Sequence, residues 1–199
     1  MLDPEIRAQL VDTIRKFVDQ RLIPAEAEVA ETDAIPQDII QEMRDLGLFG
    51  LSIPEEYGGL GLNMTEEAAL IFEIGRAAPA FRSIFATNVG IGSQGIVIDG
   101  TDAQKAAYLP RIATGELIGS FALTEPDVGS DAGSVRTTAV RDGDTYVLNG
   151  TKRFITNAPL AGAFTVMART DPAQKGAAGV SAFVVEAGCL LYTSDAADE

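Results

Sequence analysis

Apolar residues recur at helical spacing through the first part of the chain, from about residue 3 to residue 115. Because residues three and four apart lie on the same side of a helix, this spacing predicts helices with one apolar face. Pro36 suits the first turn of one of these helices, and Gly47 suits its end. Two apolar stripes show the pattern most clearly: Ile6, Leu10, Ile14, Phe17 and Val18, and then Ile39, Ile40, Met43 and Leu46.

Two further segments of this part are predicted to be buried helices, at residues 68–74 and 84–98. The second is apolar on most of its faces, which predicts that it lies inside the helical bundle. Residues 53–61 (Ile-Pro-Glu-Glu-Tyr-Gly-Gly-Leu-Gly) indicate a turn-rich connection. The glycines of this connection do not indicate a phosphate-binding loop, because the preceding strand and the lysine of such a loop are both missing.

The period of the apolar residues changes to two after residue 115. One face of a predicted strand carries Leu117, Gly119, Phe121 and Leu123. Asp142-Gly143 and Asn149-Gly150 are favoured in tight hairpin turns, because such residues accept positive φ at low cost. The other predicted strands are residues 137–141, 145–148, 153–155, 164–169 and 180–185. The predicted fold class is therefore α+β, with an N-terminal all-α helical domain followed by an antiparallel β-barrel or sheet domain.

Composition and charge argue against several classes of function. The net charge is −14, from 15 basic and 29 acidic residues, whereas a nucleic-acid surface needs clustered Lys and Arg. With no histidine and one cysteine, Cys189, the chain is a poor candidate for a metal site or a Ser-His-Asp triad. No apolar run approaches the ~20 residues that a membrane helix needs, and the acidic N-terminus is unlike a secretion signal. We therefore expect a cytoplasmic protein with no nucleic-acid partner, no membrane span and no metal.

The most informative feature is the pairing of residues 121–131 (Phe-Ala-Leu-Thr-Glu-Pro-Asp-Val-Gly-Ser-Asp) with residues 152–157 (Lys-Arg-Phe-Ile-Thr-Asn). An alternating apolar run stops at Pro126 and gives way to a loop with hydroxyl groups, small residues and free backbone amides. Such a loop is suited to seat a flat polar ligand. Phe154 and Thr156 could then supply a ring to cover that ligand and a hydroxyl group for its edge.

Charge limits what this loop can hold. Three acids crowd it: Glu125, Asp127 and Asp131. They would repel the phosphates of a dinucleotide, so the neutral ring end of a cofactor fits the loop better. Taken singly, each feature has an ordinary alternative: residues 124–130 could be a plain turn, and Phe121 and Phe154 could be core residues.

The two motifs together resemble the flavin-binding signature of the acyl-CoA dehydrogenase family, Leu-Thr-Glu-Pro-x-x-Gly-Ser-Asp followed by Trp/Phe-Ile-Thr-Asn. Phe154 stands where many members have Trp, which keeps the stacking area but removes the indole donor. The resemblance extends over residues 1–187. Its other conspicuous stretches are residues 46–51, 53–61, 104–105, 108–110 and 114–116.

The resemblance implies an organisation into an N-terminal helical domain at residues 1–116 and an incomplete middle β domain at residues 117–187. Members of the family carry a further C-terminal helical bundle, which holds the catalytic glutamate. No part of this sequence resembles that bundle. We therefore expect a truncated chain that contains no catalytic residue and finishes in a non-native tail at residues 188–199.

The family binds FAD, and the resemblance implies that this chain supplies part of the FAD site. Leu123 and Thr124 would approach the pyrimidine edge of the flavin. Phe154 would lie against one ring face, Thr156 would donate toward N5, and Ser130 would lie where acyl-CoA and the cofactor phosphates converge. The full set of implied cofactor-binding residues is Phe121, Ala122, Leu123, Thr124, Gly129, Ser130, Phe154, Ile155 and Thr156.

The implied reaction is the flavin-dependent oxidation of a fatty acyl-CoA thioester to the trans-2-enoyl-CoA. Electrons would pass to an electron-transfer flavoprotein, and the full-length enzyme would be a homo-oligomer, such as a homotetramer. Two alternatives stay open: a non-catalytic, association-prone fragment, or a flavin oxidase or monooxygenase on the same fold. Arg136 and Lys152 could meet CoA phosphates or be solvated bases, and residues 84–98 could wall the acyl channel or be plain core.

Overall fold

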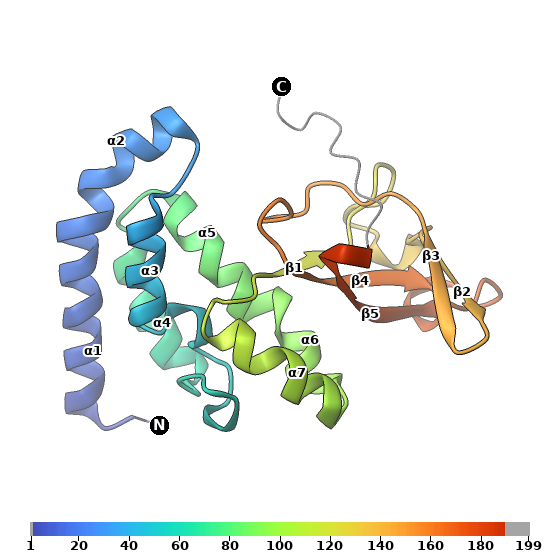
Figure 1. Cartoon of the computed structure of the whole chain (residues 1–199), viewed down its shortest axis with the longest axis horizontal. Coiled ribbons are helices and arrows are strands. Elements are labelled where there is room, and N and C mark those ends of the chain that lie inside the picture. Colours follow the sequence, from blue (N-terminus) through green and yellow to red (C-terminus); the bar gives the residue numbers. More distant parts are fainter. Residues whose placement is uncertain (1, 190–199) are drawn as a thin grey trace. The chain divides into compact units, whose positions relative to one another are not determined.

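The computed structural model describes residues 2–189, which fall into two compact units. The first unit ends at Gly119 and is helical, and the second begins at Ser120 and is built on a sheet (Figure 1). The predicted order of helices followed by strands is therefore confirmed. The predicted tail at residues 188–199 lies outside the described residues, apart from Gly188 and Cys189.

Local sequence signals set the helices of the first unit. α1 (Pro4–Phe17) starts after Asp3, whose carboxylate accepts a backbone N–H of the first turn at 2.8 Å. α4 (Met64–Ile74) starts with a capping box, in which Asn63 and Glu66 each accept the other's backbone N–H. The remaining α-helices of this unit are α2 (Ile23–Thr32), α3 (Gln37–Asp45), α5 (Pro79–Thr87), α6 (Gln94–Asp99) and α7 (Asp102–Ala113).

Both predicted stripes contribute to the large apolar core cluster of the helical unit. Ile6 is the exception, because it is 54% exposed near the start of α1. Short π or 3-10 turns connect the helices at Val18–Leu22, Leu48–Gly50, Glu55–Tyr57 and Asn88–Gly92. The largest fully buried side chains are Phe49, Phe81, Phe85, Ile14, Leu22, Met43, Leu48, Leu51, Ile53, Leu70, Ile74 and Leu109.

Two predictions for the ends of α3 have different outcomes. Pro36 precedes the helix, which begins at Gln37, so its placement in the first turn is wrong by one residue. Gly47 follows the helix with a φ of 71°, in the left-handed region that glycine adopts most easily. The predicted helix end is therefore confirmed.

Residues 84–98 are not one helix, which corrects the prediction. α5 stops at Thr87, and the π-helical turn Asn88–Gly92 separates it from α6. Within that turn Gly90 leaves the helical region, with φ −88° and ψ −116°. The segment is not wholly interior either, since Ile91 is 57% exposed and Ile98 is 69% exposed.

The buried side chain of Asn88 explains this break. Its amide donates to the carbonyl of Ile112 at 2.9 Å, and its oxygen accepts the N–H of Gly119. A Cβ added at Gly92 would lie 2.7 Å from the carbonyl oxygen of Thr87, so a larger residue cannot follow this path without a shift. Contacts with distant residues therefore override the apolar pattern of the segment.

Up to residue 189, the strands are β1 (Gly119–Ala122), which begins at the last residue of the first unit, β2 (Thr138–Asp142), β3 (Thr145–Asn149), β4 (Ala163–Arg169) and β5 (Val180–Glu186). β4 and β5 pair antiparallel from Ala163↔Glu186 to Arg169↔Val180, and β2 and β3 form an antiparallel hairpin with Gly143 at φ 58° in its turn. A parallel bridge, Thr138↔Arg169, joins the two pairs. The sheet is therefore mixed and not purely antiparallel (Figure 1).

The predicted strand at residues 153–155 is wrong. Phe154 and Asn157 have positive φ values of 57° and 63°, which no strand accommodates. Asn149-Gly150 consequently does not close a second hairpin. Gly150 instead lies against Thr137, the residue before β2, because a Cβ placed at Gly150 would be 2.3 Å from the hydroxyl of Thr137.

No helix among residues 2–189 is long and apolar enough to cross a membrane. Within the same residues, no group of three or more His, Cys, Asp or Glu side chains is arranged to hold a metal ion.

Candidate functional site

The structure brings the two signature segments together. The N–H of Arg153 donates to the carbonyl of Thr124 at 2.9 Å, and the ammonium group of Lys152 donates to the carbonyl of Leu123 at 3.0 Å. The hydroxyl of Ser120 donates to the carbonyl of Thr156. Residues 120–125 and 152–156, which are distant in sequence, therefore lie side by side.

The predicted cofactor-binding residues range from buried to exposed. Ala122 is buried in β1, while Phe121, Leu123, Thr124 and Ile155 are half-buried, and Gly129, Ser130, Phe154 and Thr156 are exposed. On β1 the more buried face carries Ser120 and Ala122, so Phe121 lies on the opposite, less buried face.

Phe154 lies on the surface of the β unit and is not a core residue. Its side chain is 78% exposed, and the guanidinium group of Arg153 lies over its ring at 4.5 Å. Its φ of 57° is rare for a residue with a Cβ and is held by hydrogen bonds on both sides of it. The ordinary alternative, in which Phe154 is a core residue, is therefore wrong.

The hydroxyl groups of the site remain available to a ligand. Within residues 2–189, the side-chain hydroxyls of Thr124, Ser130 and Thr156 have no hydrogen-bond partner. An exposed aromatic ring and hydroxyl groups on adjoining segments match what a flat heteroaromatic group requires. The residues present therefore fit the ring system of a flavin.

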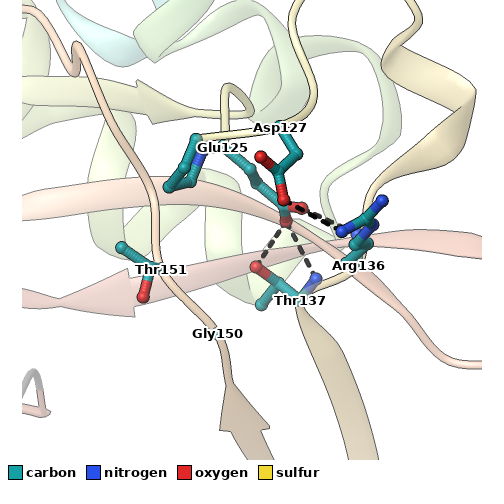
Figure 2. Close-up of a pocket in the computed structure, with 7 residues that line it drawn as sticks. Glu125, Asp127, Arg136, Thr137, Gly150 and Thr151 are labelled. Carbon is teal, nitrogen blue, oxygen red and sulfur yellow. Dashed lines mark hydrogen bonds and ion pairs between the residues drawn. The ribbon is translucent and has the colours of Figure 1, made fainter.

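The most highly connected side chain of the site is Glu125, which the sequence indicated only as a repelling charge. It is buried, and its carboxylate accepts the N–H of Arg136 at 2.8 Å, the N–H of Thr137 at 2.9 Å and the hydroxyl of Thr137. The ammonium group of Lys152 donates to the same carboxylate at 2.8 Å. Figure 2 shows the carboxylate of Glu125 directed toward Thr137.

Burial and hydrogen bonding act in opposite directions on this carboxylate. Burial alone would raise the pKa of Glu125, but hydrogen bonds from Lys152, Thr137 and the backbone of Arg136 and Thr137 lower it to about 2. Burial also lowers the pKa of Lys152, and the carboxylate of Glu125 opposes that shift. Lys152 is therefore neither a solvated base nor free to meet phosphates, in contrast to both alternatives raised from the sequence.

The other two acids of the loop are also partnered. Asp127 pairs with Arg136 at 2.9 Å, with both side chains exposed, and Asp131 accepts a hydrogen bond from the hydroxyl of Ser134. The repulsion that three bare acids would exert on phosphates is therefore reduced. Arg169 fixes the far part of the loop, because its guanidinium group donates to the carbonyls of Gly133 at 2.8 Å and Val135 at 3.0 Å.

A small pocket of about 160 Å³ lies beside the loop (Figure 2). It does not include the predicted ring and hydroxyl residues, and the basic group on its rim, Arg136, is already paired with Asp127. The pocket therefore offers neither the ring surface nor the unpaired charge that a cofactor would use. Its lining residues are Glu125, Pro126, Asp127, Arg136, Thr137, Gly150 and Thr151.

Comparison with known proteins decides the family. Residues 4–116 match the family model for "Acyl-CoA dehydrogenase, N-terminal domain", and residues 120–190 match that for "Acyl-CoA dehydrogenase, middle domain". The chain belongs to the acyl-CoA dehydrogenase family. The resemblance inferred from residues 121–131 and 152–157 is thereby confirmed.

Individual relatives agree with this assignment. An acyl-CoA dehydrogenase of Bacillus subtilis is 41% identical over 180 residues, which are 90% of this chain and 47% of the relative. Acryloyl-CoA reductase (NADH) of Anaerotignum propionicum is 42% identical over 176 residues, or 87% of this chain and 44% of the relative. The crystal structure of a glutaryl-CoA dehydrogenase from Mycobacterium smegmatis in complex with FADH2 superimposes with a TM-score of 0.83 at 36% identity, covering 93% of this chain and 46% of that one. The chain thus spans less than half the length of each of these proteins.

Proposed function

We propose that this chain provides the flavin-ring platform of an FAD-dependent acyl-CoA dehydrogenase. The observation that carries the proposal is that the segment with the exposed Phe154 ring and Thr156 is hydrogen-bonded to the segment with Thr124, and that within residues 2–189 the hydroxyls of Thr124 and Thr156 have no partner. The FADH2 complex of the related glutaryl-CoA dehydrogenase supports the choice of cofactor. The full reaction would convert an acyl-CoA to the trans-2-enoyl-CoA, with an electron-transfer flavoprotein as electron acceptor.

In this proposal each residue of the platform has a binding role. Phe154 covers one face of the ring, Leu123 and Thr124 meet its pyrimidine edge, and Thr156 donates a hydrogen bond to its central part. Ser130 lies near the phosphates of the cofactor and of acyl-CoA. FAD, when bound, supplies the acceptor for the hydride that leaves Cβ of the substrate.

The proposal assigns no residue of the described chain to removal of the α-proton. A suitable base is a carboxylate whose pKa is raised toward that of its target, whereas Glu125 has a lowered pKa and its oxygens are already occupied by donors. Glu125 is therefore excluded as the base.

The same family relationship supports three further proposals. We propose domains at residues 1–116 and 117–187, a cytoplasmic location and a homo-oligomeric full-length enzyme.

The direction of the reaction is the least constrained part of the proposal. The related protein from Anaerotignum propionicum is named a reductase, although it is as similar to this chain as the dehydrogenase from Bacillus subtilis. A ring platform serves electron transfer to or from the ring equally well. We propose dehydrogenation because both family models, the relative from Bacillus subtilis and the related structure from Mycobacterium smegmatis are named for dehydrogenases.

A titration of FAD with the purified chain tests the proposal. We expect saturable quenching of flavin fluorescence with weak affinity, because the chain spans less than half the length of its relatives. Phe154→Ala should weaken binding at least tenfold, whereas Phe72→Ala, which removes an equally exposed ring (81%) in the helical unit, should leave it unchanged. Absence of saturable binding up to about 1 mM FAD, or equal effects of the two substitutions, would overturn the proposal.

A further inference from the structure

We propose that Lys152 and Glu125 form a positioning pair, which fixes the spacing between the Leu123–Thr124 edge and the Phe154–Thr156 segment of the flavin platform. Neither side chain contacts the cofactor in this proposal. The pair acts by holding two backbone segments in register. The inference rests on the proposed function, because it specifies how the same site is held in a binding-competent shape.

Contacts at three successive residues join the two segments. The ammonium group of Lys152 donates both to the carbonyl of Leu123 at 3.0 Å and to the carboxylate of Glu125 at 2.8 Å. Between these two contacts, the N–H of Arg153 donates to the carbonyl of Thr124 at 2.9 Å. The side chain of Lys152 thus contacts the residues immediately before and after Thr124.

Glu125 extends this connection to a third segment. Its carboxylate also holds the backbone N–H groups of Arg136 and Thr137, at the start of β2. Gly150 then lies against Thr137 on the approach to Lys152, where a Cβ would be too close. Three segments of the β unit therefore meet at one carboxylate, and displacement of any of them would move the other two.

Stability alone does not account for such a pair. The side chains of Lys152 and Glu125 are only 12% and 5% exposed, so removal of both charges from water offsets much of their attraction. An apolar pair of similar size would avoid that cost, but it could neither donate to the carbonyl of Leu123 nor accept the N–H groups of Arg136 and Thr137. The directional contacts are therefore the property that an apolar pair would lose.

The unusual backbone of the neighbouring residue gives an independent reason for a positioning role. Phe154 adopts φ 57°, a conformation that persists only where its surroundings hold it. The bonds of Lys152 and Arg153 lie on one side of it, and the bond from Ser120 to the carbonyl of Thr156 lies on the other. Loss of the Lys152 contacts would leave the backbone of Phe154 held on that side by the single bond from Arg153 to Thr124.

The test compares Lys152→Met/Glu125→Gln with a matched control, Lys16→Met/Asp12→Asn. The control pair has the same 2.8 Å nitrogen-to-oxygen distance but is exposed on α1. Three quantities are measured on the intact 199-residue chain. They are the urea midpoint, the hydrogen-exchange rate of the Arg153 amide, and the dissociation constant of FAD.

We expect the buried double variant to unfold at a lower urea midpoint than the parent but to stay folded without urea, because its amide presents a donor where the carboxylate of Glu125 accepts the N–H of Arg136. Its Arg153 amide should exchange at least tenfold faster than in the parent, a larger increase than for the amides of β4 and β5, and its FAD dissociation constant should rise at least tenfold. The control should change neither quantity. A buried double variant with parental exchange and parental affinity would overturn the inference.

If Lys152→Met/Glu125→Gln does not fold, a second variant tests the positioning role. Glu125→Asp keeps both charges but shortens the carboxylate by one methylene, so it should fold and still raise the Arg153 exchange rate at least threefold; an unchanged rate would overturn the inference. The exchange measurement needs no cofactor. If the parent chain does not bind FAD, the proposed function fails, while the positioning pair is still judged by exchange at Arg153.

Discussion

The helical unit and the β unit each contain an ion pair between a lysine and a carboxylate, and the two pairs lie in different environments. Lys16–Asp12 and Lys152–Glu125 both have a nitrogen-to-oxygen distance of 2.8 Å. The first pair has side chains that are 65% and 50% exposed, whereas those of the second are 12% and 5% exposed. Since water and salt screen an exposed pair, contact distance alone says little about its energetic role. Burial, and the backbone groups that the buried charges of Lys152 and Glu125 also satisfy, separate the two ion pairs.

The largest expected effect is that of Lys152→Met alone. This substitution leaves the carboxylate of Glu125 buried without its ammonium partner, which typically costs about 3 to 5 kcal/mol. Urea unfolding, followed by circular dichroism, measures the loss. A loss that matches the one caused by Lys16→Met would show that the burial of Lys152 has no energetic consequence and would remove the basis of the comparison.

The pH dependence of stability gives the next largest effect. Glu125 titrates at about 2 in the folded chain and near its ordinary value when unfolded, so its contribution is complete above about pH 4.5 and disappears as the pH falls toward 2. The shift corresponds to stabilisation on the order of 3 kcal/mol. The lowered pKa of Lys152 acts only at alkaline pH, so it does not enter this acidic window.

Comparison of the parent with Glu125→Gln isolates this contribution from that of the other acids. The difference in unfolding free energy between the two proteins should shrink as the pH is lowered from about 6 to about 3. Glu125→Gln also leaves Lys152 without its carboxylate, but that penalty does not vary over this range because Lys152 stays protonated. A difference that is constant across the range would show that Glu125 does not titrate as its contacts require.

The order of the two units was predictable because periodicity is a local property of the sequence. Ile14, Phe17 and Val18 show helical spacing whatever the rest of the chain does, and they are buried as expected. The break at Asn88 was not predictable in this way. It depends on a side chain that reaches Ile112 and Gly119, and no local pattern carries that information.

In the candidate site, too, local features were predictable from the sequence and contacts between distant residues were not. The motifs identified which segments belong together, since Arg153 is hydrogen-bonded to Thr124 and Thr156 to Ser120. The sequence did not indicate that Glu125 is buried or that Lys152 neutralises it, because the two are 27 positions apart and each is common on surfaces. It also predicted a strand where Phe154 has a positive φ, since strand propensity does not register hydrogen bonds from neighbouring segments.

The smallest expected effect is that of Arg76→Met in the helical unit. Arg76 bridges Asp19 and Glu73, but its side chain is 43% exposed, and Glu73 keeps a second partner in Arg15 at 2.8 Å. No buried charge is left unpaired, so the urea midpoint should barely change, and any change should vanish as salt is added. Urea unfolding of parent and variant at low and high salt provides the measurement. A salt-resistant loss as large as that of Lys152→Met would mean that connectivity between elements, and not burial, separates the ion pairs of the two units.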